Sequence, residues 1–275
     1  MNHARRYWLG AAGILVSGII FVVPFAFILV TALKTEKESS LLQFTWPTQL
    51  QFIENLRQVI EAQDYMLLTA YFNSTVITVI GVTLIVVFAA MVGFVLQRRS
   101  TRASGFINFI VLFGLIMPPS VVPTIWVLQQ VHLFKTLQGM ILIEVAYGLP
   151  FAVLLFRAFV STIPRELDEA AIMDGAGPLS LFFRVILPLL RPVVVTVIVV
   201  HSVAIFNDFT NPLYYLPGSQ NATVQVTLYN FQSQYQTSFN LLFMNILLIT
   251  IPPLIIFLFF NRQIVAGMTA GAIKG

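Results

Sequence analysis

The stretch that decides the fold runs from residue 72 to residue 96 and reads FNSTVITVIGVTLIVVFAAMVGFVL. None of its 25 residues is Asp, Glu, Lys or Arg. A helix needs roughly 20 mostly apolar residues to cross the hydrocarbon core of a bilayer, whereas a strand needs only about half as many. This stretch therefore predicts a membrane-spanning helix.

Five more stretches have the same apolar character, at about 8–32, 106–128, 138–158, 192–214 and 241–260. Over the whole chain 58% of the residues are hydrophobic and only 9% are charged, and the mean hydropathy is +0.88. A soluble domain is about 25% charged. We therefore expect an all-α integral membrane protein with about six transmembrane helices, forming a single transmembrane domain over residues 1–275.

The first apolar stretch could instead be a secretory signal, because Arg5 and Arg6 precede it. The apolar region of a signal has about 7–15 residues, and this stretch is nearly twice as long. We therefore expect a retained membrane anchor.

The basic residues predict how the chain lies in the membrane. With the N-terminus in the cytoplasm, four of the fifteen Lys and Arg fall outside, namely Lys34, Lys37, Arg57 and Lys135. The other eleven are cytoplasmic: Arg5, Arg6, Arg98, Arg99, Arg102, Arg157, Arg165, Arg184, Arg191, Arg262 and Lys274. Cytoplasmic loops carry an excess of Lys and Arg, so both termini are predicted to be cytoplasmic.

Several kinds of site are disfavoured by the sequence. The chain has no cysteine, which excludes disulfides and thiolate metal sites, and no His, Asp and Glu cluster has a spacing typical of a metal site. The net charge of +4 comes from basic residues scattered beside apolar runs, which indicates membrane topology rather than nucleic-acid binding. No phosphate-binding Gly-x-x-x-x-Gly-Lys-Ser/Thr motif is present, so no nucleotide site is expected.

The predicted cytoplasmic loop at about 161–188 contains residues 163–178, IPRELDEAAIMDGAGP. Pro164 suits the first position of a helix, and the acidic residues that follow it suit the positive end of the helix dipole. Gly175 can end that helix in a left-handed conformation, and Pro178 can start another. We expect a short amphipathic helix under the membrane, with a merely solvated connector as the alternative.

The same loop resembles the EAA signature of bacterial ABC importer permeases. The matching residues are Glu169, Ala170, Ala171, Gly175, Val185, Leu187 and Pro188, with Val185 where the family has Ile. Weaker similarities, in the right order, resemble the carbohydrate-importer (MalG-like) permeases of this binding-protein-dependent family. They lie at residues 71–75, 117–119, 149–151, 206–213 and 262–271.

This resemblance implies the type I ABC importer permease fold, in the bacterial cytoplasmic (inner) membrane. It implies a heterodimer with a second permease, two ATPase subunits that bind ATP and Mg, and an extracytoplasmic solute-binding protein. The chain itself would bind no cofactor and catalyse no reaction. Its loop would be the coupling helix that docks on the ATPase, through Glu169, Ala170, Ala171, Asp174, Gly175, Leu187 and Pro188.

Polar residues in the fifth stretch are candidates for the substrate pathway. Polar groups inside a bilayer are costly and usually face a pathway or the interior of a helix bundle. Amide and carboxylate groups between aromatic rings suit a sugar, which predicts a pathway role for Asn207, Asp208, Phe209 and Asn211. The alternatives are hydrogen bonding to the partner permease or a position at the outer interface. We expect His201 to be a packed, hydrogen-bonded residue. We expect Glu144 to cap a packed interface, with lining of the outer gate as its alternative.

Other functions remain open at this point. Related permeases carry glycerol phosphate or polyols, although the scarcity of basic residues in the spans favours a neutral solute. An ion-coupled secondary transporter would show inverted repeats, and none is evident. A membrane scaffold would not need the polar, aromatic fifth stretch.

Overall fold

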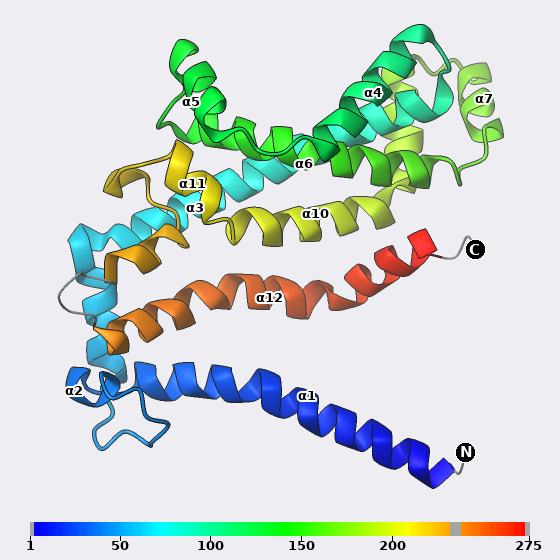
Figure 1. The fold of residues 1–275 in the computed structure, drawn as a ribbon. Helices are drawn as coiled ribbons and strands as arrows, with labels where there is room; N and C mark the ends of the chain where they lie inside the picture. Colours follow the sequence, from blue (N-terminus) through cyan, green and yellow to red (C-terminus); the bar gives the residue numbers. More distant parts are fainter. Residues whose placement is uncertain (1–2, 232–237, 273–275) are drawn as a thin grey trace. The chain divides into compact units, whose positions relative to one another are not determined.

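The computed structural model describes residues 3–231 and 238–272, and every regular element within those ranges is helical (Figure 1). The predicted all-α fold class is confirmed. Lys274 and residues 232–237 of the loop before the last helix lie outside the described residues. The longer α-helices are α1 (His3–Ala32), α3 (Phe52–Arg98), α4 (Arg102–Ile116), α5 (Val121–Gln130), α6 (Leu137–Val160), α7 (Glu166–Met173), α10 (Arg191–Phe206) and α12 (Phe239–Ala272).

Short helical segments connect these elements. The short α-helices are α2 (Glu36–Ser39), α8 (Pro178–Ser180), α9 (Leu187–Leu189) and α11 (Thr210–Tyr215). A π-helical segment, η1 (Leu181–Ile186), links α8 to α9. Two 3₁₀ segments, η2 (Ser219–Asn221) and η3 (Val226–Phe231), follow α11.

By length and composition, four helices of the described residues can cross a membrane: α1, α3, α6 and α12. A fifth is added if the pair Pro178–Leu189 and Arg191–Phe206, bent by 77°, counts as one span. The apolar α4 is shorter, with 15 residues. These six helical units lie at the six predicted positions.

Two predicted spans are shorter than the sequence suggested. The stretch at 106–128 is divided, because α4 ends at Ile116 and α5 begins at Val121. Pro118 and Pro119 lie in the break, where proline removes a backbone donor and pushes the preceding residue out of helical geometry. The stretch at 192–214 divides after Phe206, and α11 begins only at Thr210.

The helix α3 is longer than the predicted stretch at 72–96 and contains a kink. Ala62 has extended backbone, and Gln63, Asp64 and Tyr65 have φ values of 51°, 56° and 59°. Non-glycine residues rarely adopt this left-handed conformation. The part before the kink is therefore a separate helical segment that precedes the membrane span.

The chain divides into two compact units. Unit 1 comprises Met1–Leu68 and Val226–Ile251, and unit 2 comprises Thr69–Gln225 and Pro252–Gly275. The core of unit 2 lies where α3, α6 and the segment before α10 pack together, with Ile85, Val153, Phe156, Ile186 and Leu190 fully buried. The single transmembrane domain remains a prediction.

Close packing of α3 on α6 depends on Gly93. A Cβ atom added there would lie 2.8 Å from Phe156 Cβ and 2.9 Å from the backbone nitrogen of Arg157. We expect Gly93→Ala to destabilise the protein by about 1–3 kcal/mol, because overpacking forces helices apart. Thermal unfolding of the purified protein measures this effect.

A second glycine provides the matched control. Gly105 lies in α4, and a Cβ added there would meet nothing within 4 Å. Gly105→Ala should leave stability unchanged or raise it by up to about 1 kcal/mol, because alanine is the better helix former. Equal melting temperatures for the two variants would contradict this account of the α3–α6 contact.

Candidate functional site

The helix α7 begins at Glu166, with Arg165 as its N-terminal cap residue. The sequence placed its start at Pro164, which instead lies two residues before the helix. The backbone N–H groups of Asp168 and Glu169 both donate to the Arg165 carbonyl, at 2.9 and 3.1 Å. The acidic residues still occupy the first turn, where they complement the helix dipole.

Gly175 ends α7 as predicted. Its φ of +84° is in the left-handed region, where glycine has no steric penalty. Gly175 N–H donates to the Ile172 carbonyl at 3.0 Å, and Ala176 N–H donates to the Ala171 carbonyl at 2.9 Å. This pair of bonds is the Schellman arrangement. As also predicted, Pro178 then starts the next helix, α8.

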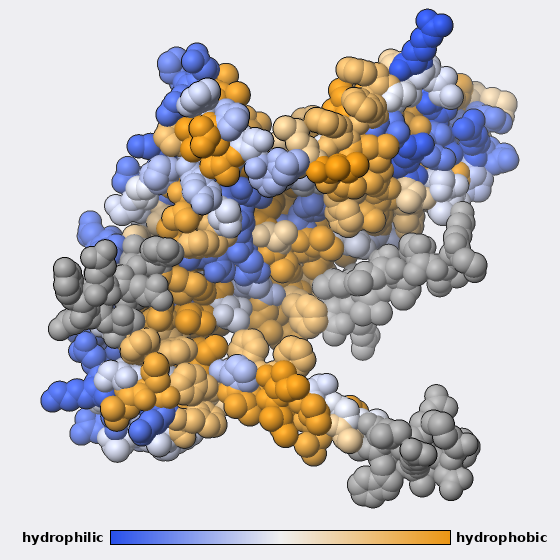
Figure 2. All heavy atoms as spheres, viewed as in Figure 1, coloured by the Kyte–Doolittle hydropathy of each residue, from blue (hydrophilic) through white to orange (hydrophobic). Residues whose placement is uncertain are grey.

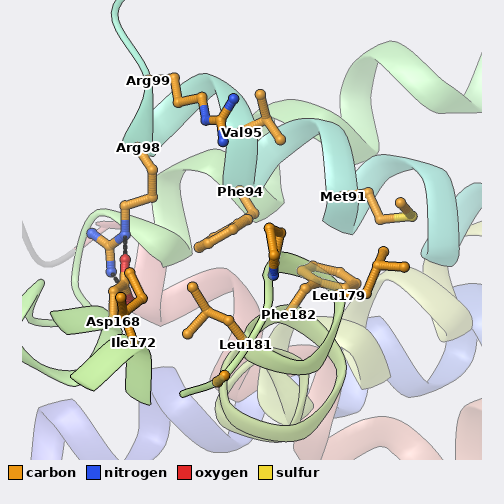
Figure 3. Close-up of a pocket in the computed structure, with 12 residues that line it drawn as sticks. Met91, Phe94, Val95, Arg98, Arg99, Asp168, Ile172, Leu179, Leu181 and Phe182 are labelled. Atoms are coloured by element: carbon orange, nitrogen blue, oxygen red, sulfur yellow. Dashed lines mark hydrogen bonds and ion pairs between the residues drawn. The ribbon is translucent and has the colours of Figure 1, made fainter. Parts of the chain in front are cut away.

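An ion pair fixes α7 to the end of α3 (Figure 3). Arg98 Nε lies 2.7 Å from Asp168 Oδ2, and Arg98 Nη2 donates to Asp168 Oδ1 at 3.3 Å. The same nitrogen donates to the Ile163 carbonyl at 3.0 Å. Only 11% and 13% of the two side chains are exposed. Such a two-pronged, largely desolvated pair holds both position and orientation.

A groove of about 500 Å³ separates the rest of the loop from α3. In Figure 3, Phe94 of α3 and Phe182 and Leu181 of the loop point toward one another across it. Its lining is mostly apolar, while Arg98 and Asp168 lie at one end. The ion pair therefore lies at the polar end of a largely apolar groove.

The opposite face of α7 is open. Glu169, Ala170, Asp174 and Gly175 are exposed and Ala171 is half-buried. Met173 beside them is 82% exposed. These residues form a small, acidic protrusion with an apolar tip, here called the knob. Its short side chains allow another protein surface to approach the helix closely.

The last two predicted loop residues lie elsewhere. Leu187 is half-buried and Pro188 is exposed, both in α9, between the fully buried Ile186 and Leu190. This segment turns the chain through 77° into α10. Leu187 and Pro188 therefore belong to the bend and not to the exposed knob.

The candidate pathway residues lie at the break between α10 and α11. Asp208 Oδ1 accepts hydrogen bonds from the backbone N–H groups of Thr210 and Asn211, at 2.9 and 3.2 Å. Asn207 donates to the Val203 carbonyl at 2.9 Å, and its Oδ1 accepts from Gln225 at 3.0 Å. Hydrogen bonding to nearby backbone groups therefore explains in part why polar residues occur at these positions.

The structure adds a buried partner to these residues. Glu144 of α6 is 7% exposed, and its carboxyl group lies close to Asp208 and Asn211. Tyr147, one turn further along α6, lies close to Tyr215 of α11. Glu144 and Tyr147 are three residues apart, so the sequence alone indicates that they share one face of a helix. That α11 packs against this face is known only from the fold. We call Glu144, Tyr147, Asp208, Asn211 and Tyr215 the polar cluster.

His201 is packed, as expected, but its Nε2 does not form the expected hydrogen bond with any of the described residues. It is 7% exposed, and its ring centroid lies 6.2 Å from that of Phe151. Its Nε2 has no hydrogen-bond partner in the described part of the chain. Across residues 3–231 and 238–272, no group of three or more His, Asp or Glu side chains could hold a metal ion.

A family model described as "Binding-protein-dependent transport system inner membrane component" matches residues 85–270. The chain belongs to this family. The match covers α6, the whole loop at 161–188 and the polar cluster, so the predicted ABC importer permease is confirmed. The family is one of multi-pass membrane transport components rather than of enzymes.

Two relatives show the breadth of the similarity. The permease is 29% identical over 256 residues to the melibiose/raffinose/stachyose import permease protein MelC of Bacillus subtilis (strain 168), covering 92% of this chain and 91% of MelC. It is 28% identical over 274 residues to the probable starch degradation products transport system permease protein AmyC of Thermoanaerobacterium thermosulfurigenes. That match covers 99% of this chain and 98% of AmyC.

A solved structure confirms the fold. A chain of a bacterial ABC transporter involved in the import of the acidic polysaccharide alginate superposes with a TM-score of 0.82 at 18% sequence identity. The superposition covers 95% of this permease and 98% of that chain. At this identity the likeness shows a shared fold, not a shared substrate.

Proposed function

We propose that this permease forms, with a second related permease, the translocation pathway for a neutral sugar or oligosaccharide. Import is driven by two separate ATPase subunits, which bind ATP and Mg, and the solute is delivered by an extracytoplasmic solute-binding protein. The names of the relatives support the substrate class, since MelC and AmyC are named for oligosaccharides and starch products. Both termini lie in the cytoplasm in this proposal.

The observation that carries the proposal is the exposed end of α7. Glu169, Ala170, Asp174 and Gly175 protrude from a helix that Arg98 fixes to α3. A knob that is exposed on one face and anchored on the other can transmit a push from a docked ATPase to a membrane helix. Ala171 completes the docking face, and Leu187 and Pro188 carry the movement through the bend into α10.

The polar cluster is the proposed solute-facing part of this chain, with Asn207 and Phe209 beside it. Its side chains are acids, amides and phenols, and it has no basic group. Such groups accept and donate hydrogen bonds to sugar hydroxyls, while an anionic solute would meet a carboxylate. This composition favours neutral sugars over acidic ones and over glycerol phosphate.

Asp208 can be tested separately for capping and for solute contact. We expect Asp208→Asn to keep α11 folded, because an amide oxygen still accepts the two backbone N–H groups. If Asp208 also contacts solute, the variant should assemble normally but show at least a several-fold higher KM for uptake. Asp208→Ala loses both roles and should lower stability by about 1 kcal/mol as well. If Asp208→Asn takes up solute with the wild-type KM, then Asp208 acts only as a cap and does not contact solute.

The proposed function is tested by uptake into sealed vesicles that contain both permeases and both ATPase subunits. ATP is supplied on the side of the ATPase subunits, and the solute-binding protein is supplied on the opposite side. A labelled neutral oligosaccharide should then accumulate. Accumulation should stop when ATP or the ATPase subunits are omitted. Uptake that needs only an ion gradient, or that prefers an acidic saccharide, would refute the mechanism or the substrate class, respectively.

A further inference from the structure

The loop between α1 and the first segment of α3 exposes an unusual number of large apolar side chains. Trp46 is 74% exposed, Leu50 66%, Leu41 64% and Phe44 58%. In Figure 2 hydrophobic side chains are visible in the region that this loop and the end of α1 occupy in Figure 1. Contiguous apolar patches of this kind mark a contact with another molecule or with a membrane.

The loop folds back along the membrane-spanning helix that precedes it. The rings of Phe44 and Phe27 lie 6.0 Å apart between centroids, and Phe27 also meets Phe243 of α12 at 5.5 Å. Phe27 precedes the end of α1 at Ala32 by five residues, or about 7.5 Å along the helix axis. Phe44 therefore packs against the apolar span Ala12–Ala32, of which only 6% is buried within the protein.

Two polar groups of the loop, the Gln43 carbonyl and the Thr45 hydroxyl, accept hydrogen bonds from one buried lysine. Lys34 is 1% exposed, and its Nζ donates to the Gln43 carbonyl at 2.6 Å and to Thr45 Oγ1 at 3.2 Å. Thr45 N–H donates to the same Gln43 carbonyl at 3.0 Å. Backbone polar groups near hydrocarbon must be satisfied within the protein. Lys34 meets this need for the Gln43 carbonyl, next to the exposed apolar side chains of Leu41, Phe44 and Trp46.

A second set of hydrogen bonds joins the loop to α2. Glu38 accepts a hydrogen bond from Thr48 N–H at 3.2 Å and another from the Thr48 hydroxyl. Thr35 and Glu38 also form a capping box at the start of α2. The loop therefore has its own hydrogen-bond network and at the same time exposes large apolar side chains, among them Trp46 and Phe44. Tryptophan is enriched at the level of lipid headgroups.

We propose that residues 41–53 form an interfacial anchor, which binds the lipid surface where the C-terminal end of α1 leaves the bilayer. The occupant of the apolar patch is phospholipid, with the side chains of Leu41, Phe44 and Trp46 among the upper acyl chains. Two observations favour lipid as the occupant: the patch is continuous with the apolar, membrane-spanning α1 through the Phe27–Phe44 contact, and its most exposed aromatic residue is Trp46, a residue type enriched at the headgroup level. The proposal depends neither on the coupling role of α7 nor on the side of the membrane.

Nitroxide labels at single cysteines test this anchor, since the chain has no cysteine of its own. Trp46→Cys and Leu41→Cys, labelled in transporter complexes whose other subunits lack cysteine, are reconstituted into phospholipid vesicles. Gln58→Cys, on the exposed polar segment before the kink, is the matched control. Collision with oxygen, which concentrates in lipid, is compared with collision with a water-soluble nickel chelate.

We expect the oxygen-to-nickel accessibility ratio at positions 41 and 46 to be several-fold higher than at position 58. The use of two labelled positions guards against a local effect of either substitution. Higher nickel accessibility at both positions would overturn the proposal, because the patch would then face water. Shielding from both reagents, with or without added solute-binding protein, would also overturn it, because a protein subunit would then cover the patch.

Discussion

Replacing Arg98 with alanine is expected to uncouple ATP hydrolysis from solute uptake. The substitution leaves the Asp168 carboxylate and the Ile163 carbonyl without their shared donor in a site where little of either charged side chain is exposed. Breaking such a pair by removing one partner costs about 3–5 kcal/mol. Even 3 kcal/mol lowers the population of the anchored loop relative to a detached one by roughly a hundredfold.

Parallel rates of uptake and of ATP hydrolysis in vesicles measure this effect. Uptake should fall at least tenfold while the ATPase subunits keep their basal activity. Arg99→Ala is the matched control, because Arg99 is the next residue, is exposed and takes no part in the pair. The exchange of Arg98→Asp with Asp168→Arg should restore part of the uptake. Wild-type uptake by Arg98→Ala would contradict the role of the pair.

Replacing Glu169 with lysine is expected to abolish uptake without removing the permease from the membrane. Glu169 is exposed, and its side chain has no hydrogen-bond or ion-pair partner among the described residues. Surface changes of this kind usually alter stability by less than about 0.5 kcal/mol. The loss must then arise at the docking surface, where a like charge would meet the basic residue expected on the ATPase.

Membrane abundance, assembly and uptake are measured together for this variant. Glu169→Gln, which removes the charge without reversing it, should reduce uptake but not abolish it. A matching acidic substitution of the basic ATPase residue should rescue Glu169→Lys. If Glu169→Lys permease assembles and transports at the wild-type rate, the docking role of this carboxylate is wrong.

Much of this fold is predictable because lipid imposes simple demands on a chain. Long uncharged runs such as 72–96 have to be helices, and Gly175 could be recognised as a helix end from its position after an acidic, amphipathic segment. The ends of the spans were harder to predict. Hydropathy continues across Pro118 and Pro119 and across Asn207, whereas the helices stop there for reasons of backbone geometry and capping.

The tertiary contacts of the candidate site could not be predicted from the sequence. In the sequence Arg98 is recognisable only as a charge that indicates topology, and its partner Asp168 lies 70 residues further along the chain. Glu144 and Asp208 likewise meet only because α11 folds against α6. Such pairs are fixed by tertiary packing between distant segments, on which local periodicity carries no information.

The docking of α7 on a separate ATPase is tested most directly by a cysteine crosslink in the assembled transporter. Met173→Cys places a thiol on the tip of α7, where the native side chain is 82% exposed, and Ile116→Cys places one at the end of α4, where the native side chain is 80% exposed. We expect rapid crosslinking from position 173 to a cysteine in the ATPase docking groove, in a yield that changes with ATP, and none from position 116. Equal crosslinking from both positions, or none from position 173, would contradict the account.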